Sequence, residues 1–318
     1  MTAVRKWRLA PGWATRFLAV VRYEMLWNIR KKKFIGVLML VFVFATLGIA
    51  LPVVLSNVSG EPLEPNPDYL VGAGAGSLAF FLFALVIAMN SISGEFETGT
   101  IVPLLTKPVS RTTVFLGKLF TAFLLLLIAY TFLFVYQMVG GTIVFGPQNN
   151  LHLVPLTLLG NILSTFVWVA IVLALGALPK NSLITALVAF GVFFALFITA
   201  PIVSVFTGQA GALSYVPGSG ATGYLLPEGN QIPINASSIS TGTDSIASNF
   251  VNYVLNPSAN VTFARIGGFT PDQMSTLIPV YTESVSLILL RSLLVAITYS
   301  VAFILVAWIA FKRAQILD

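Results

Sequence analysis

Six stretches of the sequence are almost continuously apolar, and each exceeds the about 20 residues that a helix needs to cross a bilayer core of about 30 Å. None of them holds more than one charged residue. Because none alternates in the way of a membrane β-strand, each is expected to be a helix. The six stretches are residues 34–56, 69–92, 112–139, 154–178, 182–206 and 285–311.

The composition places the whole chain among integral membrane proteins. Of its 318 residues, 57% are hydrophobic and only 9% are charged, which lies outside the range of soluble domains. We therefore expect an all-α polytopic membrane protein with six transmembrane helices. Its predicted parts are an N-terminal segment (1–33), five spans (34–206), a lobe (207–284), and a last span with a tail (285–318).

Positive charges fall mainly in one of the two sets of segments that the spans separate. Fifteen of the 17 Lys and Arg residues lie in the N-terminal segment, the second and fourth connections and the tail, whereas seven of the eleven acids lie in the other set. By the positive-inside rule, both termini are cytoplasmic and the chain is a multi-pass protein of the cell membrane. The net charge of +6 therefore favours anionic lipids over nucleic acid as a partner.

The N-terminal segment is expected to contain a helix that lies on the inner leaflet. It contains Trp7, Trp13 and Trp27, and indole rings favour the membrane interface. Four apolar residues follow each other at a spacing of four, as on one face of a helix. They are Phe17, Val21, Met25 and Ile29.

The connections on the other side contain three N-x-S/T sequons, at Asn57, Asn235 and Asn260. These are candidate glycosylation sites if the source organism glycosylates proteins. The largest of these connections, residues 207–284, is rich in Gly, Ser, Thr, Asn and Pro, and alternates weakly over residues 248–254. Without a cysteine in the chain it has no disulfide, so we expect it to pack loosely, to lean on the spans or to bind an extracytoplasmic partner.

Catalytic motifs are poorly represented. The chain has one histidine, His152, and no cysteine, so it offers no zinc-binding cluster. Gly117-Lys118 lacks both the earlier glycine of a phosphate-binding loop and the Ser or Thr that follows its lysine. We expect no catalytic site, metal or cofactor in this chain.

Residues 92–118 form a compact charged segment between two apolar spans. Glu95 and Glu97 precede an apolar patch, residues 101–105, and then come Pro108, Ser110 and Arg111. One interpretation is a solvated loop, with Ser110 capping the next helix. The other is a short amphipathic docking helix, because a merely solvated loop has no use for an apolar patch.

This segment resembles the loop after the second span in permease subunits of ABC-2 type transporters. The arrangement of an interfacial N-terminal helix, six spans and cytoplasmic termini is also similar to that family, over residues 14–313. The lobe is longer than expected for a minimal member. The matching positions are Glu95, Gly99, Thr100, Leu104 or Leu105, Pro108, Val109, Ser110, Arg111, Leu116, Gly117 and Lys118.

The resemblance implies a dimer, with a second copy or a paralogue, in which each permease binds a separate cytoplasmic ABC ATPase. ATP and Mg²⁺ would bind to that partner, and residues 93–111 would act as a coupling helix. Glu95, Glu97 and Arg111 would orient the contact, Gly99 would permit close approach and Thr100 would cap or turn the segment. The implied ATPase-coupling residues are Glu95, Glu97, Gly99, Thr100, Pro108, Ser110, Arg111 and Lys118.

Polar residues within the spans are candidates for a translocation path. Gln137, Asn161 and Arg291 would be penalised by lipid and should face protein or water, as helix-bridging or substrate-contacting groups. The apolar walls favour a hydrophobic or amphiphilic substrate over an ion; export is the expected direction, with import as the alternative. Two alternatives stay open: a non-conducting mechanotransmission subunit that moves an extracytoplasmic partner, and a membrane enzyme or anchor without an ATPase. Residues 72–77, rich in Gly and Ala, allow either close helix packing or bending.

Overall fold

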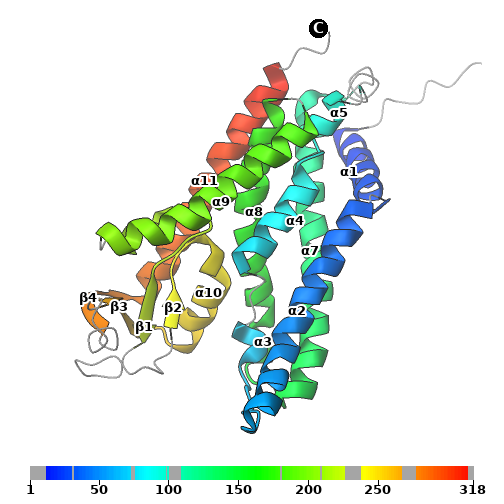
Figure 1. Ribbon diagram of the computed structural model, residues 1–318. Helices are drawn as coiled ribbons and strands as arrows, with labels where there is room; N and C mark the ends of the chain where they lie inside the picture. The colour runs from blue at the N-terminus through cyan, green and yellow to red at the C-terminus, as the bar shows by residue number, and fades with distance from the viewer. Residues whose placement is uncertain are drawn as a thin grey trace, which may run out of the picture.

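The computed structural model describes residues 12–30, 32–72, 76–97, 99, 109–179, 181–207, 210–225, 238–266 and 277–313. They form a bundle of long helices and a small lobe that lies beside one half of it (Figure 1). The end of the bundle that holds Arg30, Arg111 and Arg313 is called the basic end below, and the opposite end the lobe end.

The helices of the bundle run back and forth between these two ends. Two short 3-10 helices, η1 and η2, lie in connections at the lobe end, and a third, η3, precedes α10. The helices are α1 (Trp13–Arg30), α2 (Lys32–Ser59), α3 (Tyr69–Gly72), α4 (Gly76–Ala88), α5 (Ser93–Glu97), α7 (Arg111–Phe145), η1 (Leu151–Leu153), α8 (Val154–Ala177), α9 (Ser182–Thr207), η2 (Ala210–Tyr215), η3 (Thr243–Ser245), α10 (Ile246–Leu255) and α11 (Val285–Arg313).

Within the described ranges, six stretches are long and apolar enough to cross a membrane, which confirms the six predicted spans. The second stretch differs from its predicted range, residues 69–92, because it covers Gly76–Glu97. Within that stretch, Glu95 and Glu97 lie on α5, a short helix that follows the turn after α4. The six are Phe34–Ser59, Gly76–Glu97, Arg111–Phe145, Leu151–Ala177, Ser182–Ala200 and Val285–Arg313.

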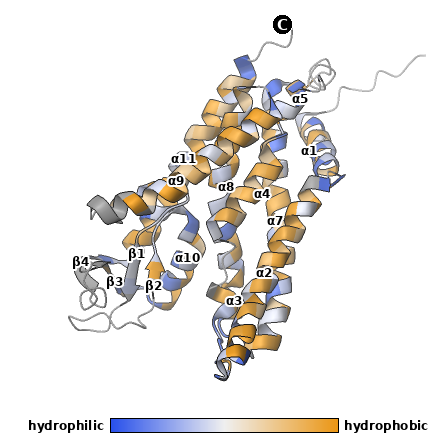
Figure 2. Cartoon of the chain, in the orientation of Figure 1, coloured by the Kyte–Doolittle hydropathy of each residue, from blue (hydrophilic) through white to orange (hydrophobic). Residues whose placement is uncertain are grey.

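Helix α8 forms the centre of the bundle. Trp168 is fully buried on it, with its ring 5.5 Å from that of Phe81 on α4 and 5.3 Å from that of Phe193 on α9, both edge to face. Such arrangements are the favoured ones for aromatic pairs. By contrast, leucines such as Leu51, Leu187 and Leu294 are exposed on α2, α9 and α11. Figure 2 shows the apolar residues along the length of these helices, as lipid contact requires.

Glycines shape both the backbone and the packing near the lobe end of the second span. Helix α3 ends at Gly72 and α4 begins at Gly76, whose φ of 76° is left-handed and favours glycine. Tyr69 of α3 packs against Gly141 of α7, where an added Cβ would lie 2.8 Å from the Tyr69 ring. Glycine at position 76 thus serves the backbone conformation at the start of α4, and glycine on α7 allows the close packing.

Helix α1 occurs where the sequence predicts a helix, and its buried face shares Val21 with the predicted apolar row. Its buried residues are Val20, Val21, Glu24 and Asn28, whereas the predicted apolar row leaves Ile29 exposed. A face that includes a carboxylate packs inward because a lysine of α7 lies opposite it.

The lobe contains a four-stranded antiparallel sheet in the order β2-β1-β3-β4. The bounds are β1 (Thr222–Leu225), β2 (Ser238–Ser240), β3 (Asn260–Ile266) and β4 (Leu277–Ser284). Phe263 and Val261 of β3 share a small core with Val285 and Ile288 at the start of α11. The sheet therefore packs against the last span. This agrees with the expectation that the lobe leans on the spans.

The prediction of an all-α fold is correct for the spans. It is wrong for the lobe, which contains this sheet. Residues 248–254, which alternate weakly in sequence, belong to helix α10 instead of a strand. Ile246 and Phe250, one helical turn apart, pack into the core of the bundle, so burial on one helical face outweighs the alternation.

Helix α10 is the part of the lobe that packs against the bundle. A Cβ at Gly160 of α8 would lie 2.4 Å from the Cα of Ala247, so only glycine lets the two helices approach this closely. Asn249 of α10 donates a hydrogen bond to the hydroxyl of Ser292 on α11, at 3.2 Å. The lobe is thereby joined to two spans through buried contacts.

Asp244, in η3, is a buried carboxyl at this junction. Burial raises the pKa of Asp244 to about 6, although polar contacts from Ser77, Thr243, Trp168 and the Gly218 backbone oppose the rise. The pKa in the folded state thus lies above the ordinary value of 3.8, and the folded state binds the proton more tightly than the unfolded chain does.

Asp244→Asn is expected to stabilise the protein above pH 6. Native stability should fall as pH rises from about 4 to about 6 and then stay lower by roughly 3 kcal/mol, because the charged carboxylate is buried. The melting temperature of the variant in nanodiscs, followed by tryptophan fluorescence, should exceed the native value at pH 7.5 and approach it near pH 4.5. Glu64→Gln, at an exposed position, is the control. A difference independent of pH would contradict this account.

Candidate functional site

A buried lysine joins three helices at the basic end. Lys118, in the second turn of α7, is 4% exposed and donates from Nζ to Glu24 Oε1 of α1 and to Glu95 Oε1 of α5, each at 2.6 Å. These three residues are called the Lys118 cluster below. Side chains from segments 23 and 94 positions away thus meet at one ammonium group.

The cluster holds its members together because none of them is well solvated. Glu24 is as buried as Lys118, and Oε2 of Glu95 has no hydrogen-bond partner within the described part of the chain. If all three groups are ionised, the cluster carries one excess negative charge. Taking any partner away leaves an uncompensated buried charge, which is the costly situation for buried ion pairs.

A narrow contact between α1 and α7 brings Glu24 within reach of Lys118. A Cβ at Gly117 would lie 2.6 Å from Val20 Cγ1, so glycine allows the backbones to come close. One turn earlier, Trp13 Nε1 donates to Thr113 Oγ1 at 3.2 Å. Helix α1 is therefore held along the first two turns of α7.

Glu97 connects α5 to a fourth helix. Its Oε2 accepts from the backbone N–H of Ser182 at 3.1 Å and from the Ser182 hydroxyl at 2.5 Å. A carboxylate at the first residue of α9 satisfies an orphan N–H and complements the positive end of the helix dipole. Both carboxylates of α5 are thus engaged within the chain.

The far end of the connecting loop, residues 98–108, is also anchored. Ser110 accepts from the backbone N–H of Thr113 at 3.1 Å, which confirms that it caps the next helix. Arg111 Nη1 donates to the carbonyl of Lys312 near the end of α11, at 2.7 Å. The residues that flank the loop on both sides are therefore held by contacts with α7, α9 and α11, and through Lys118 with α1.

Three further residues of this segment were predicted to take part in ATPase coupling. Thr100 and Pro108 lie outside the described residues. Gly99 has a φ of 68°, and no atom of the described residues lies within 4 Å of an added Cβ, so glycine serves the backbone conformation there. Close approach of a partner to Gly99 stays a prediction.

The predicted path residues are enclosed by protein. Gln137 on α7 and Asn161 on α8 are buried, and Asn161 Nδ2 donates to the Thr157 carbonyl of its own helix at 3.0 Å. Neither residue faces lipid or open water in this conformation. Arg291, at the lobe end, pairs with Glu283.

Among the described sequons, Asn57 and Asn260 are exposed at the lobe end, and Asn235 lies outside the described residues. The described ranges contain no group of three metal-ligating side chains.

Glu24 is the member of the cluster that sequence reasoning missed. It is the only acid among residues 1–33, and Lys118 is the only charge in its apolar stretch. A lone acid in a basic segment and a lone lysine in an apolar stretch were the available signal for a pair. Nothing in the sequence alone indicates that α1 lies against α7.

Lys118→Met is expected to destabilise the protein by about 3 to 5 kcal/mol, because two carboxylates would face each other without a cation. SDS-induced unfolding of the purified protein measures this loss. The triple variant Glu24→Gln/Glu95→Gln/Lys118→Met removes all three charges and should recover most of it. Arg313→Met, at an exposed position of the same end, is the control and should behave like the native chain. Equal stability of the native protein and Lys118→Met would refute the buried cluster.

Comparison with known proteins identifies the family of this chain. No curated protein matches the sequence significantly. The family model described as ABC-2 family transporter protein matches residues 21–201, more than half of the chain, including the whole Lys118 cluster and the connecting loop. The chain is thus a multi-pass membrane protein of the ABC-2 transporter family, and it acts as the membrane permease component of an ABC transporter.

Proposed function

We propose that the protein exports a hydrophobic or amphiphilic substrate and is driven by ATP hydrolysis on a separate ABC ATPase that binds the basic end. The observation that carries this proposal is the anchoring of the connecting loop. Side-chain contacts of Glu95, Glu97 and Arg111 join its two ends to α1, α7, α9 and α11. A loop anchored in this way transmits a displacement to the bundle instead of absorbing it.

The contacts suggest separate roles for the loop and its flanks. Because Glu95 points to Lys118 and Glu97 to Ser182, we assign these carboxylates to positioning the loop. Contact with the ATPase is assigned to the loop itself, whose apolar patch includes Leu104 and Leu105. ATP-driven closure of the ATPase would move α5 and the helices attached to it as a rigid body.

We place the basic end in the cytoplasm, at the cell membrane. Most Lys and Arg residues lie in segments on that side, and α1 begins and α11 ends there (Figure 1). This orientation would put the connecting loop where ATP is present and the lobe outside. ATP and Mg²⁺ would bind to the ATPase.

The apolar character of the bundle supports a lipid-like substrate over an ion. Its interior is lined with buried aromatic rings such as those of Phe80, Phe83 and Phe193, and its polar groups are enclosed. The exposed apolar rows on α2, α9 and α11 are suited to lipid and to a second permease copy or a paralogue, which we propose completes the pathway as a dimer.

A mechanotransmission role is the second candidate. Its support is the attachment of the lobe, since Ala247 packs on Gly160 of α8 and Asn249 bonds to Ser292 of α11. Movement of these spans would carry the lobe with it and act on an extracytoplasmic partner. An ATPase-bound complex that moves no substrate would favour this candidate.

The double variant Leu104→Asp/Leu105→Asp is expected to lose the ATPase, because charges would replace the apolar docking surface. The measurement is a pull-down of the tagged chain from its native membrane in mild detergent, with at least ten-fold less ATPase recovered and an unchanged melting temperature. Val58→Asp, at a position 80% exposed at the lobe end, is the control and should retain the ATPase. Retention of the ATPase by the loop variant would contradict the assignment of docking to this patch.

A further inference from the structure

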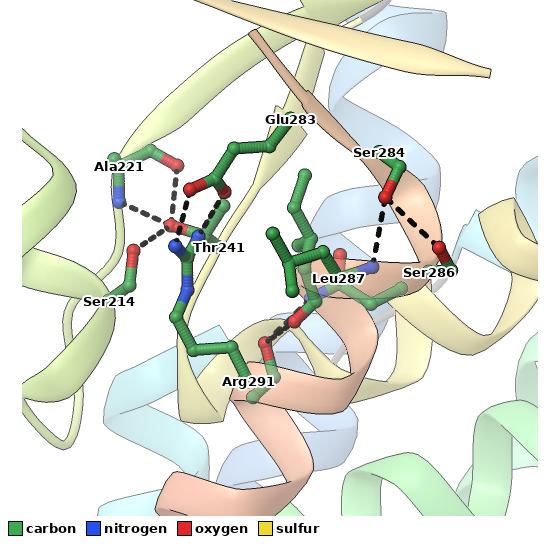
Figure 3. A network of polar contacts seen from close by, with 11 residues as sticks. Ser214, Ala221, Thr241, Glu283, Ser284, Ser286, Leu287 and Arg291 are labelled. Atoms are coloured by element: carbon green, nitrogen blue, oxygen red, sulfur yellow. Dashed lines mark hydrogen bonds and ion pairs between the residues drawn. The ribbon is translucent and has the colours of Figure 1, made fainter. Parts of the chain in front are cut away.

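A second charged site lies at the junction of the lobe and the last span. Arg291, in the second turn of α11, and Glu283, near the end of β4, form a two-pronged ion pair with two N–O distances of 2.8 Å. Their side chains are 12% and 18% exposed, so the pair is mostly but not completely enclosed. Figure 3 shows the two side chains facing each other.

Two hydrogen-bond donors of this site take part in neither a hydrogen bond nor an ion pair with any described residue. Nε of Arg291 and the hydroxyl of Tyr281 are buried without a partner in the described structure. Tyr281 and Glu283 are two residues apart on β4, so they share one face of the strand. Burial and the nearby Glu283 carboxylate raise the pKa of Tyr281, which keeps its hydroxyl protonated. Buried unused donors cost free energy, and acceptor oxygens of an anion would relieve that cost.

An aromatic side chain closes one side of the site. The Arg291 guanidinium carbon lies 5.8 Å from the centre of the Tyr215 ring, which is 54% exposed. The hydroxyl of Tyr299 donates to the Tyr215 carbonyl at 3.1 Å and holds this residue against α11. Tyrosines of this kind gather where a membrane meets water.

An apolar row on α11 continues from Arg291 toward the basic end. Leu287, Leu290, Leu294, Ile297 and Val301 are exposed at helical spacing, and Arg291 lies beside the first three. A molecule whose anionic group reached Arg291 could lay its hydrocarbon chain along this row. The combination therefore fits an amphiphile better than a free ion.

We propose that Arg291 and Tyr281 bind the phosphate head group of an anionic lipid-like amphiphile, with Glu283 occupying Arg291 while the site is empty. This inference rests on the proposed function, whose substrate class it narrows. Arginine suits phosphate because its planar group offers paired donors. The bound head group would displace Glu283 and leave its tail on the apolar row of α11.

Titration of the purified full-length protein with dioleoyl phosphatidic acid, followed by native mass spectrometry, tests this site. Arg291→Gln should weaken binding about ten-fold. Glu283→Gln should strengthen it about ten-fold, because the phosphate would no longer compete with a carboxylate. If both variants weaken binding, the pair is a structural ion pair and the proposal is wrong.

Two further arms complete the test. Inorganic phosphate at millimolar concentration should not displace the lipid, and displacement would overturn the assignment to an amphiphile. If Arg291→Gln fails to fold, Arg291→Lys should bind with intermediate affinity, and native affinity would refute the paired-donor geometry. Lipid binding is measured without the ATPase. The result is therefore independent of whether the protein exports a substrate or docks an ATPase.

Discussion

The architecture of the basic end depends on one buried ammonium group placed between two carboxylates. Lys118 would be unfavourable in the apolar surroundings of α7 without Glu24 and Glu95, and each acid would be unfavourable without it. This mutual dependence holds α1, α5 and α7 together where the connecting loop begins. Gly117 makes the arrangement sterically feasible, since any side chain there would separate α1 from α7.

The two ends of the bundle use different means to join their parts. At the basic end, charged side chains connect short segments, as Glu97 does with Ser182. At the lobe end, the close contact of Gly160 with Ala247 joins α10 to α8, and the Arg291–Glu283 pair joins the sheet to α11. Helices α8 and α11 run between the two ends, so they are the routes by which a movement at one end would reach the other.

The spans were predictable because continuous apolarity over a bilayer thickness has few alternatives to a helix. The capping of α7 by Ser110 was predictable for a local reason as well, since it involves residues three positions apart. The partners of Lys118 were not, because they depend on how α1 and α5 pack in space. The sheet was missed because its strands are short and far apart in sequence, as with Thr222–Leu225 and Asn260–Ile266, and pair only in three dimensions.

The Lys118 cluster is expected to make α1, α5 and α7 move as one body. The chain contains no cysteine, so Arg22→Cys/Leu116→Cys places two spin labels on exposed positions of α1 and α7. Pulsed electron paramagnetic resonance would measure the distance between them in the ATPase complex, with and without a non-hydrolysable ATP analogue. One narrow distance distribution, unchanged by the nucleotide, is the predicted result. A shift or splitting of that distribution on nucleotide binding would show that the Lys118 cluster opens, and would contradict the account.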